Sequence, residues 1–517
     1  MRSALRWLVL LIPTTLLLLA LTHLAAPTAH TRIYEHLPNV KLPPVFTPSG
    51  PKKLPDIDEG LPYMPPEPTS PTAPSTPSAP PSTDPIHELW NQWSEIIHKA
   101  RPRTLPISIS GRASTEKPPH LMTIREPYRD LVKNPYYEID SLQEWHRVFM
   151  EELNSFVETP GVFKGQGVVV VGGGEYFGPA IIGIHMLRRA GSMLPVQVFV
   201  PDKEEYNPTL CEQYLPKLNA SCVVMADILS QGARDTADLK ISHYQYKSLA
   251  LLFSSFEEVL LLDSDSMALV APEKDLFKTE PYTSAGLVVW PDFWQATESP
   301  KFYKIAGLPS MPMNLPPTSS ESGQLLVNKK THLKTLLLAA YYNIYGPDHY
   351  YPLLSQNALG QGDKETFMAA AAVLHAPYYR VQTPVARLGR DTGAEDKGTA
   401  MIQHLPSDDL LKTSPSATDS DAKVRPAFLH ANTPKMNAGH LVDEGDLFKN
   451  DGKTRLRLLG TEKEQMDMFG IDLEQAIWEL LVQTGCELAD VIREWKKREK
   501  LCSRLEEHYS AMFKSGS

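Results

Sequence analysis

The chain has 517 residues, of which 42% are hydrophobic and 22% charged, a globular composition long enough for one large domain with appendages. Its formal net charge is −10 and it has no basic cluster, which argues against nucleic acid as the main partner. The four cysteines contain no C-x-x-C pair, so no zinc site is expected. They fall into two close pairs, Cys211 with Cys222 and Cys486 with Cys502. This grouping allows two local disulfides in an oxidising compartment, or free buried thiols.

The first 26 residues have the pattern of a membrane anchor. Residues 1–6 form a short tail with two arginines, and residues 7–26 are uncharged, leucine-rich and long enough to cross a bilayer as a helix. Because the positive charges come first, the tail is predicted to be cytosolic and the rest of the chain lumenal. A cleaved signal peptide is the alternative, with Leu24-Ala25-Ala26 as its cleavage site. The length and leucine content favour an uncleaved, single-pass type II anchor.

Residues 27–127 are predicted to form a disordered stem. Within them, residues 62–85 are dense in proline, serine and threonine, a composition that buries too little apolar surface to fold. Such a segment prefers extended conformations and acts as a spacer, and in a lumenal protein it can carry O-linked sugar. A short helix is expected at residues 87–100. The stem would hold a catalytic domain away from the membrane.

Order is expected to resume near Tyr128, after which strand and helix patterns alternate. Strands are predicted at residues 167–171, 195–200, 221–226, 259–262 and 285–290. Helices are predicted at residues 140–157, 179–190, 208–218, 241–256, 330–345, 366–374, 473–484 and 487–512. The first three strands and the helices between them have the β-α-β-α-β order of a parallel sheet with right-handed crossovers. The fold class is therefore α/β, with a C-terminal helical extension.

The junction between residues 259–262 and Asp263-Ser264-Asp265 is the most informative stretch. Four consecutive apolar residues predict a strand buried on both faces, and side-chain alternation points both acids to one side of its carboxyl end. Ligands bind at such strand ends, and two carboxylates suit a hard divalent cation that carries a pyrophosphate. This is the chemistry of the D-x-D motif in glycosyltransferases that use nucleotide sugars. D-x-D alone is common by chance, so an acidic strand exit with a helix N-cap is an equal alternative.

Three other residues are candidates with ordinary structural alternatives. Lys247 lies in a predicted helix and could reach a phosphate, but its spacing favours a solvated lysine. Asp363 precedes the predicted helix 366–374 and could meet an acceptor, although acids commonly cap helix N-termini. His430 follows a short apolar strand and as a neutral imidazole would suit Mn²⁺, although a lone histidine is more often structural.

Together, several motifs resemble the fungal Golgi α-mannosyltransferases over about residues 167–439. The matching motifs are Lys247-Ser248-Leu249-Ala250, Ser254-Ser255-Phe256, the run from Val259 to Asp265, Glu321-Ser322-Gly323-Gln324 and Gly362-Asp363-Lys364-Glu365-Thr366-Phe367. The resemblance implies a Rossmann-like GT-A catalytic domain at residues 128–440, followed by the helical extension at residues 441–517. It also implies GDP-mannose as donor, Mn²⁺ as cofactor and retention of the donor's α configuration.

The resemblance also implies roles for individual residues. The implied metal ligands are Asp263, Asp265 and His430. The residues implied to bind the donor are Lys247, Asp263, Asp265, Gln324 and Lys435. The carboxylates implied to act on the donor mannose or the acceptor hydroxyl are Glu321 and Asp363. The sequence His-x-x-x-Pro-Lys at 430–435 departs from the His-x-x-Gly-x-x-Lys pattern of the glycogenin-like group, which bears on His430 and Lys435.

The predicted function is transfer of mannose from GDP-mannose to a mannose hydroxyl on N-linked or O-linked glycans or cell-wall mannan, with α-1,2 linkage favoured over α-1,3. Another retaining hexosyltransferase of the same fold is an alternative. A non-catalytic Golgi scaffold subunit of a mannan polymerase complex is an alternative of another class, against which the intact acidic motifs count. The expected location is the Golgi membrane, with a lumenal catalytic domain, glycoprotein glycans as acceptors and other mannosyltransferases as complex partners.

Overall fold

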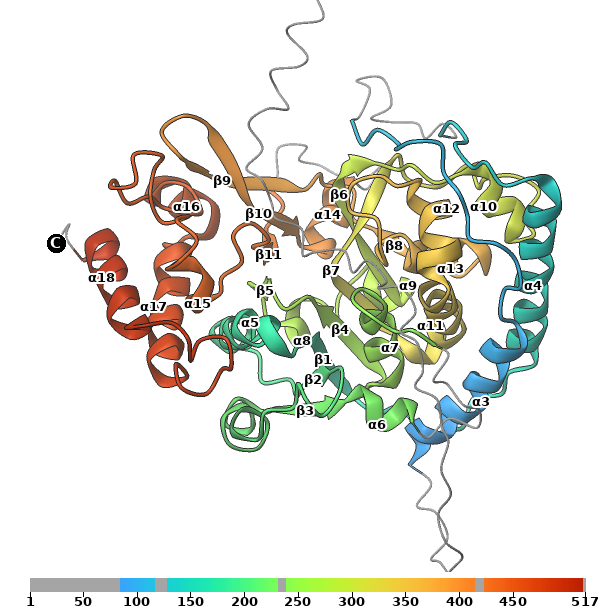
Figure 1. Ribbon diagram of the computed structural model, residues 1–517, viewed down its shortest axis with the longest axis horizontal. Helices are drawn as coiled ribbons and strands as arrows, with labels where there is room; N and C mark the ends of the chain where they lie inside the picture. The colour runs from blue at the N-terminus through green and yellow to red at the C-terminus, as the bar shows by residue number, and fades with distance from the viewer. Residues whose placement is uncertain (1–83, 117–127, 231–238, 414–422, 515–517) are drawn as a thin grey trace, which may run out of the picture. The chain divides into compact units, whose positions relative to one another are not determined.

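The computed structural model describes residues 84–116, 128–230, 239–413 and 423–514, and Figure 1 shows their helices and strands. The predicted cytosolic tail, membrane anchor and most of the predicted stem, residues 1–83, lie outside the described residues. Among the described helices, none is both long enough and apolar enough to cross a membrane.

A seven-stranded sheet in the order β3-β2-β1-β4-β7-β6-β8 forms the centre of the fold (Figure 1). Its strands are β1 (Gln166–Val171), β2 (Val196–Val200), β3 (Ala220–Val224), β4 (Glu258–Leu262), β6 (Leu287–Gln295), β7 (Thr318–Asn328) and β8 (Tyr379–Arg380). The first four pair in parallel, which confirms the predicted β-α-β-α-β arrangement. Strand β7 is antiparallel to both of its neighbours, β4 and β6. The sheet is therefore mixed.

A second, four-stranded sheet in the order β5-β11-β10-β9 is antiparallel at every pairing. Its strands are β5 (Ser266–Ala268), β9 (Ala386–Asp391), β10 (Asp396–His404) and β11 (Pro426–His430). Strand β5 begins directly after Asp265, and in the β5–β11 pairing Ser266 lies opposite His430. This small sheet thus carries the end of β11 to the end of β4.

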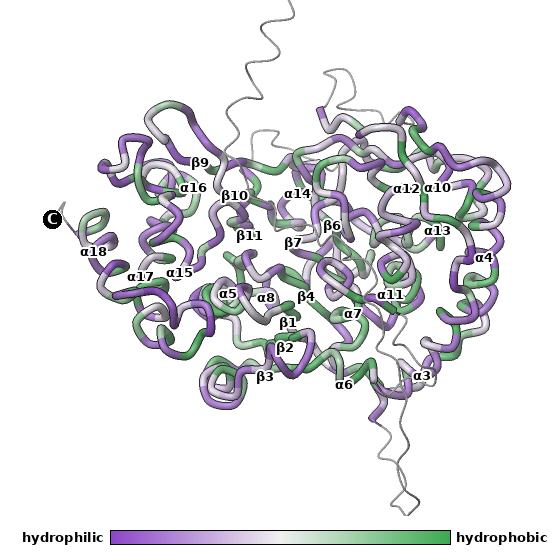
Figure 2. Tube along the Cα trace, viewed as in Figure 1, coloured by the Kyte–Doolittle hydropathy of each residue, from purple (hydrophilic) through white to green (hydrophobic). Residues whose placement is uncertain are grey.

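Alternation along the central strands divides the hydrophobic core into two layers. Val259 and Leu261 of β4 enter one layer, whereas Leu260 and Leu262 enter the other. All four are buried, as predicted for a strand covered on both faces, and Figure 2 shows the mainly hydrophobic colouring of the central strands. Residues of α4, α7, α11 and α13 form much of the first layer, and residues of α5, α17 and the second sheet form much of the other.

The helices agree with most of the predicted ranges. They are α3 (Pro85–Lys99), α4 (Tyr136–Ser155), α5 (Phe177–Arg189), α6 (Met225–Leu229), α7 (Gln245–Phe253), α8 (Pro272–Asp275), α9 (Tyr282–Ala285), α10 (Pro300–Ile305), α11 (Lys329–Ile344), α12 (Tyr351–Ser355), α13 (Thr366–Val373), α14 (Pro406–Thr413), α15 (Ala438–Leu441), α16 (Glu462–Phe469), α17 (Leu473–Glu487) and α18 (Leu501–Phe513). Short helical turns cover residues 174–176, 209–218 and 346–350. The predicted helix 241–256 is shorter, because only residues 245–253 are helical.

Helix α3 confirms the short helix predicted at residues 87–100, but its burial contradicts the prediction that residues 27–127 form a disordered stem. Its side chains Trp90 and Trp93 are fully buried and pack edge-on against Phe253 of α7. The Trp90 ring N–H donates a hydrogen bond to the carbonyl of Leu229, and Asp84 caps the first turn of the helix. The folded part thus includes residues 84–116. The proline-rich composition ends at the start of α3, whose apolar residues lie on one face of the helix.

The predicted helix 487–512 is also wrong in its first half. Residues 488–500 form turns, and helix α18 begins only at Leu501. A disulfide joins Cys486 at the end of α17 to Cys502 at the start of α18, and a second joins Cys211 to Cys222. Of the two alternatives for the cysteines, the structure therefore has the disulfides. Because the first disulfide brings the two helix ends together, the chain between them has to turn.

We expect Trp93→Ala in the full-length protein to lower the free energy of unfolding by about 3–5 kcal/mol, because it removes a fully buried ring. Tyr137→Ala, in the exposed face of α4, is the control and should change it by less than about 0.5 kcal/mol. Guanidinium unfolding followed by circular dichroism measures both values. Equal stability of the two variants would show that α3 is not part of the core.

Candidate active site

The eight residues that the sequence analysis singled out form one connected cluster at the carboxyl end of β4. Asp263 and Asp265 follow β4 directly, and the neighbouring strand β7 carries Glu321 and Gln324. Helix α7 contributes Lys247, Asp363 precedes α13, and β11 ends at His430, five residues before Lys435. Segments that are far apart in the sequence therefore meet at one edge of the sheet, where α/β folds bind ligands.

Asp263, Asp265 and His430 are arranged as a metal site requires. Their ligand atoms all lie within 4.8 Å of one another, and His430 Nε2 is 3.1 Å from Asp265 Oδ1. The backbone holds this arrangement, because the N–H of Ala431 donates to the carbonyl of Asp265 at 3.0 Å. Two carboxylates and an imidazole suit Mn²⁺ or a similar divalent cation. The donor set therefore fits the implied metal.

Lys247 is not the solvated lysine that its spacing favoured. Its ammonium group is buried, 3.1 Å from Asp263 Oδ1 and 3.1 Å from Asp363 Oδ2. It also donates to the Ser322 hydroxyl at 2.9 Å. Burial alone would lower the pKa of Lys247, but Asp263 and Asp363 raise it above its ordinary value. Lys247 is therefore a buried cation that pairs with Asp263 and Asp363. It contacts these carboxylates in the structure, whereas the sequence had suggested contact with a phosphate.

The Gly362–Glu365 element joins the site to three neighbouring elements. Asp363 reaches Lys247 of α7, and Lys364 reaches Asp292 of β6 at 2.8 Å. Glu365 accepts hydrogen bonds from the hydroxyl of Ser319 and the backbone N–H of Ser320 in β7. The side chain of Asp363 makes no capping bond to α13, whose N-cap residue is Glu365. The helix-cap alternative for Asp363 is thus not what the structure shows.

Glu321 lies behind His430, on the side away from Asp265. Its Oε1 is 3.2 Å from His430 Nδ1 and accepts the N–H of Gly323 at 2.7 Å. Its Oε2 accepts a hydrogen bond from the Gln324 side chain at 2.7 Å. Residue 323 has to be glycine, because a Cβ there would lie 2.5 Å from His430 Nδ1. Glu321 therefore orients the imidazole, as carboxylates behind metal-bound histidines commonly do.

Gln324, implied to bind the donor, is fully buried in this structure. Its side-chain N–H donates to Glu321, and its Oε1 has no hydrogen-bond partner among the described residues. The structure thus places Gln324 beside Glu321 and not on the open side of the cluster.

The opposite charges in the cluster set its protonation states. Burial alone would lower the pKa of His430, but Asp265 and Glu321 raise it well above its ordinary value. Burial would raise the pKa of Asp265, but His430 and Lys435 hold it below its usual range. Burial dominates at Asp263 and raises its pKa in spite of Lys247. Without a metal, the two carboxylates on either side of His430 therefore favour its protonated form.

Lys435 and Tyr176 form the solvent-accessible rim of the cluster. Lys435 pairs with Asp265, and its ammonium lies 5.8 Å from the centre of the Tyr176 ring. Burial and the neighbouring Glu175 raise the pKa of Tyr176 to about 12, so the phenol stays neutral. Neither Tyr176 nor Lys364 was predicted as a site residue, although Lys364 lies within one of the matching motifs. The signal for Tyr176 was the run of glycines at 172–174, which follows β1 and ends at the same sheet edge as β4.

We expect Mn²⁺ binding to expel the proton from His430, because only a neutral imidazole can bind a metal. The apparent affinity for Mn²⁺ should rise by about tenfold per pH unit for each proton released as the pH increases through neutrality. Calorimetric titration with Mn²⁺ in buffers of different ionisation enthalpy counts the released protons. A His430→Gln variant should bind more weakly and with a smaller pH dependence. An affinity independent of pH would contradict the assignment of His430 as ligand.

A family model described as "Mannosyltransferase putative" matches residues 165–318 and 308–408. The α-1,2-mannosyltransferase MNN21 of Candida albicans is 36% identical over 439 residues, covering 72% of this chain and 65% of the relative. The α-1,2-mannosyltransferase MNN22 of the same yeast is 33% identical over 438 residues, covering 69% and 73%. The α-1,2-mannosyltransferase MNN2 of Saccharomyces cerevisiae is 39% identical over 300 residues, covering 52% and 50%. The chain thus spans half to about three quarters of the length of these relatives.

Among solved structures, the glycosyltransferase GlyE of Streptococcus pneumoniae aligns with a TM-score of 0.27 and 15% identity, covering 42% of this chain and 45% of that one. The galactosyltransferase LgtC aligns with a TM-score of 0.24 and 14% identity, covering 38% and 72%. Scores of this size establish neither fold nor function. The sequence matches do establish kinship: the chain belongs to the fungal mannosyltransferase family.

Proposed function

We propose that this protein is a metal-dependent mannosyltransferase with a GT-A fold that transfers mannose from GDP-mannose to a mannose hydroxyl, forming an α-1,2 linkage. The observation that carries the proposal is the grouping of Asp263, Asp265 and His430 at the carboxyl end of β4. The linkage is supported by the names of the relatives, which are α-1,2-mannosyltransferases. The parallel strands β3-β2-β1-β4 followed by the antiparallel β7 support the GT-A fold.

The charges of the cluster support a divalent cation beside the donor diphosphate. When His430 is neutral, the four carboxylates of Asp263, Asp265, Glu321 and Asp363 face the two ammonium groups of Lys247 and Lys435. A divalent cation completes this balance, which matters because unpaired buried charge is costly. Bound between Asp263, Asp265 and His430, Mn²⁺ would act as a Lewis acid toward the leaving diphosphate.

Lys435 would bind the same diphosphate from the rim. Its side chain is 38% exposed, so its ammonium can reach a substrate while it stays beside Asp265. A cation held there would stabilise the negative charge that builds on the phosphate as the sugar bond breaks. Lys247 would act differently, since it is buried and keeps Asp263 in place for the metal.

The partners of the two candidate catalytic carboxylates favour retention by same-face attack. A covalent intermediate needs a free carboxylate beneath the anomeric carbon. Glu321 is buried, ion-paired with His430 and hydrogen-bonded to Gly323 and Gln324, and Asp363 is buried against Lys247. Neither is available as a nucleophile in this arrangement. In the same-face route the leaving phosphate takes the acceptor proton, so no further carboxylate is required.

We further propose a Golgi membrane location, with the catalytic domain in the lumen and glycans of glycoproteins or cell-wall mannan as acceptors. The two disulfides support an oxidising compartment, because disulfides persist there and are rare in the cytosol. Complexes with other mannosyltransferases are a further proposal. The grouping of buried carboxylates with Lys247, His430 and Lys435 supports an enzyme over a scaffold subunit, since a scaffold has no need of such a cluster.

Turnover of GDP-mannose by the full-length protein with α-mannobiose and Mn²⁺ tests the proposal. We expect a mannotriose whose new linkage is α-1,2 by NMR. A panel of other nucleotide sugars identifies a different hexosyltransferase, and an α-1,3 product identifies the other linkage. No turnover of any nucleotide sugar would favour the scaffold alternative.

We expect Asp263→Ala and Asp265→Ala to lower kcat/KM with GDP-mannose by about 10²–10³-fold or more, because each removes a ligand that holds charge at the transition state. Asp391→Ala is the matched control, since Asp391 is an exposed acid paired with Lys449 far along the chain. It should keep wild-type rates in the same Mn²⁺-dependent assay. Full activity of either site variant would exclude the metal assignment.

A further inference from the structure

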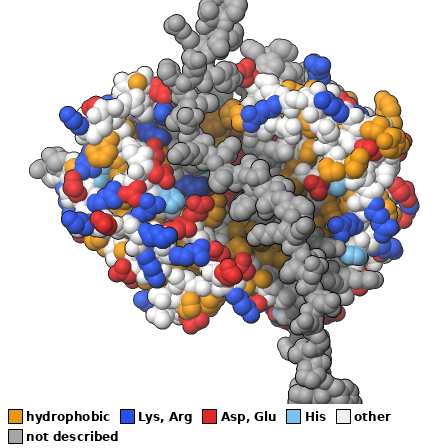
Figure 3. All heavy atoms as spheres, in the orientation of Figure 1, with side chains coloured by type: hydrophobic (Ala, Val, Ile, Leu, Met, Phe, Trp, Pro, Cys, Tyr) orange, Lys and Arg blue, Asp and Glu red, His pale blue; other side chains and the backbone are white. Residues whose placement is uncertain are grey.

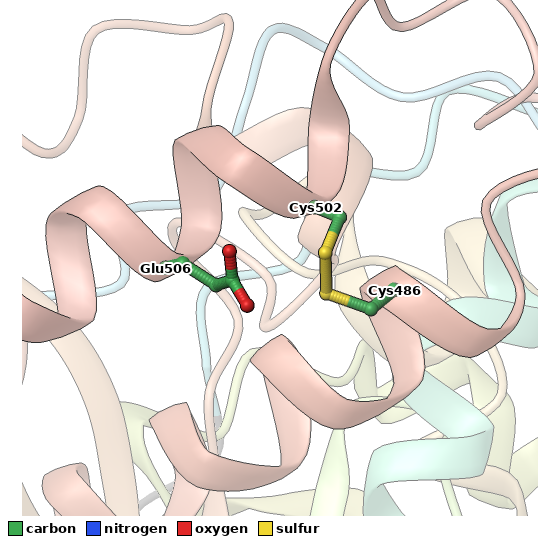
Figure 4. A group of neighbouring side chains, drawn as sticks. All are labelled: Cys486, Cys502 and Glu506. Atoms are coloured by element: carbon green, nitrogen blue, oxygen red, sulfur yellow. A yellow bond between two sulfur atoms is a disulfide. The ribbon is translucent and has the colours of Figure 1, made fainter.

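The disulfide-closed segment between α17 and α18 packs against α5 and α15, beside the rim of the candidate active site. Figure 4 shows Cys486 on α17 bonded to Cys502 on α18, with the Glu506 side chain nearby. Although these three residues lie close together, the cysteines are bonded to each other and do not form a metal site. Their bond closes residues 488–500 into a loop, and this loop carries Trp495 inward.

Trp495 is enclosed between two glycines of different elements. Its side chain is almost fully buried. A Cβ on Gly178 of α5 would lie 2.6 Å from its Cζ2, and a Cβ on Gly439 of α15 would lie 2.5 Å from its Cδ1. No real Cβ approaches another atom so closely, so the ring requires glycine at both positions. The indole thus locks the start of α5 to α15.

Asn437 connects the indole to the rim of the site. The Trp495 ring N–H donates to Asn437 Oδ1 at 2.9 Å, and the Asn437 side-chain N–H donates to the carbonyl of Glu175 at 3.0 Å. The backbone N–H of Asn437 donates to the carbonyl of Lys435 at 2.7 Å. Asn437 therefore contacts Lys435 through its backbone N–H and the residue that precedes Tyr176 through its side chain.

Ion pairs also hold the loop. Arg493 pairs with Glu205 at 2.8 Å, and Arg498 pairs with Asp443, which also pairs with Arg504 of α18. In Figure 3 the side of the molecule that carries the C-terminal helices shows acidic and basic side chains interspersed, as such pairs require. These exposed pairs are individually weak. The directed, buried contact is the one from Trp495 to Asn437.

We propose that Trp495 is a positioning residue for sugar transfer: through Asn437 it fixes the Lys435 ammonium beside Asp265 and the Tyr176 ring next to it. This inference rests on the proposed function, in which Lys435 binds the donor diphosphate. The C-terminal segment is then a brace for the donor side of the active site. Loss of the indole N–H removes one of three hydrogen bonds that hold the Asn437 side chain; the others join it to the backbone N–H of Gly439 and the carbonyl of Glu175. The Lys435 segment then samples more positions and binds the donor less well.

Trp495→Phe tests the brace, because phenylalanine keeps a ring and removes the N–H. Trp478→Phe is the matched control: Trp478 is a fully buried tryptophan of α17 whose ring N–H has no hydrogen-bond partner among the described residues. We expect Trp495→Phe to raise the KM for GDP-mannose by about tenfold, the scale seen when a residue behind a ligand is lost. Its thermal midpoint should fall no further than that of Trp478→Phe, which should keep the wild-type KM.

Amide hydrogen exchange of peptides over residues 432–441, without donor, provides a readout that does not depend on catalysis. Exchange should be faster in Trp495→Phe than in wild type and unchanged in Trp478→Phe. Unchanged exchange in Trp495→Phe overturns the inference, and so does an unchanged KM. If the wild-type protein does not turn over GDP-mannose, the proposed function fails, and the exchange result alone decides whether Trp495 positions the Lys435 segment.

Discussion

Lys247 sits between Asp263 and Asp363, and the arrangement of the site follows from this buried pairing. An ionised carboxylate without a partner in the interior costs several kcal/mol. Asp263 and Asp265 follow a strand that is buried on both faces, so each needs a cation within reach. Lys247 serves Asp263, whereas His430 and Lys435 serve Asp265. Because these cations come from segments before and far after β4, only a fold that brings α7 and β11 to the end of β4 can keep both acids charged.

The second sheet brings a cation, His430, to the buried carboxylate of Asp265. Strand β5 starts immediately after the acids and pairs with β11, so the β5–β11 register fixes the distance between Asp265 and His430. Glu321 then holds the far side of the imidazole. The metal assignment thus depends on backbone pairing and not on one flexible side chain. Lys435 lies on a loop that, among the described residues, makes no ladder hydrogen bonds to the main sheet. Trp495 holds this loop in place through Asn437.

Local patterns were sufficient to predict much of this molecule. The apolar run 259–262, the first three strands and helices α5, α11 and α13 all follow from periodicity, which short-range sequence encodes. The direction of each strand and the contacts between distant side chains could not be predicted from local sequence. Nothing in residues 318–328 shows that β7 is antiparallel, and nothing near Lys247 shows that Asp363 lies above it. Helix α3 was predicted at residues 87–100, but its burial in the core was not, because its tryptophans directly follow a proline-rich segment. The break at 488–500 lies between two cysteines whose pairing could not be decided from composition.

Exposure divides the cluster into a support and an open side. The side chains of Asp265, Glu321 and Asp363 are all less than 10% exposed, whereas those of Asp263 and Lys435 are 24% and 38% exposed. Tyr176 is 41% exposed beside Lys435. Among the described residues of the cluster, Asp263 and Lys435 therefore form the exposed side, where one anionic ligand would meet a cation bound by the acids and the ammonium of Lys435 together. The buried carboxylates act indirectly: Asp363 holds Lys247, and Glu321 holds His430. These contacts keep Asp263 and Asp265 in positions from which both could bind one metal ion.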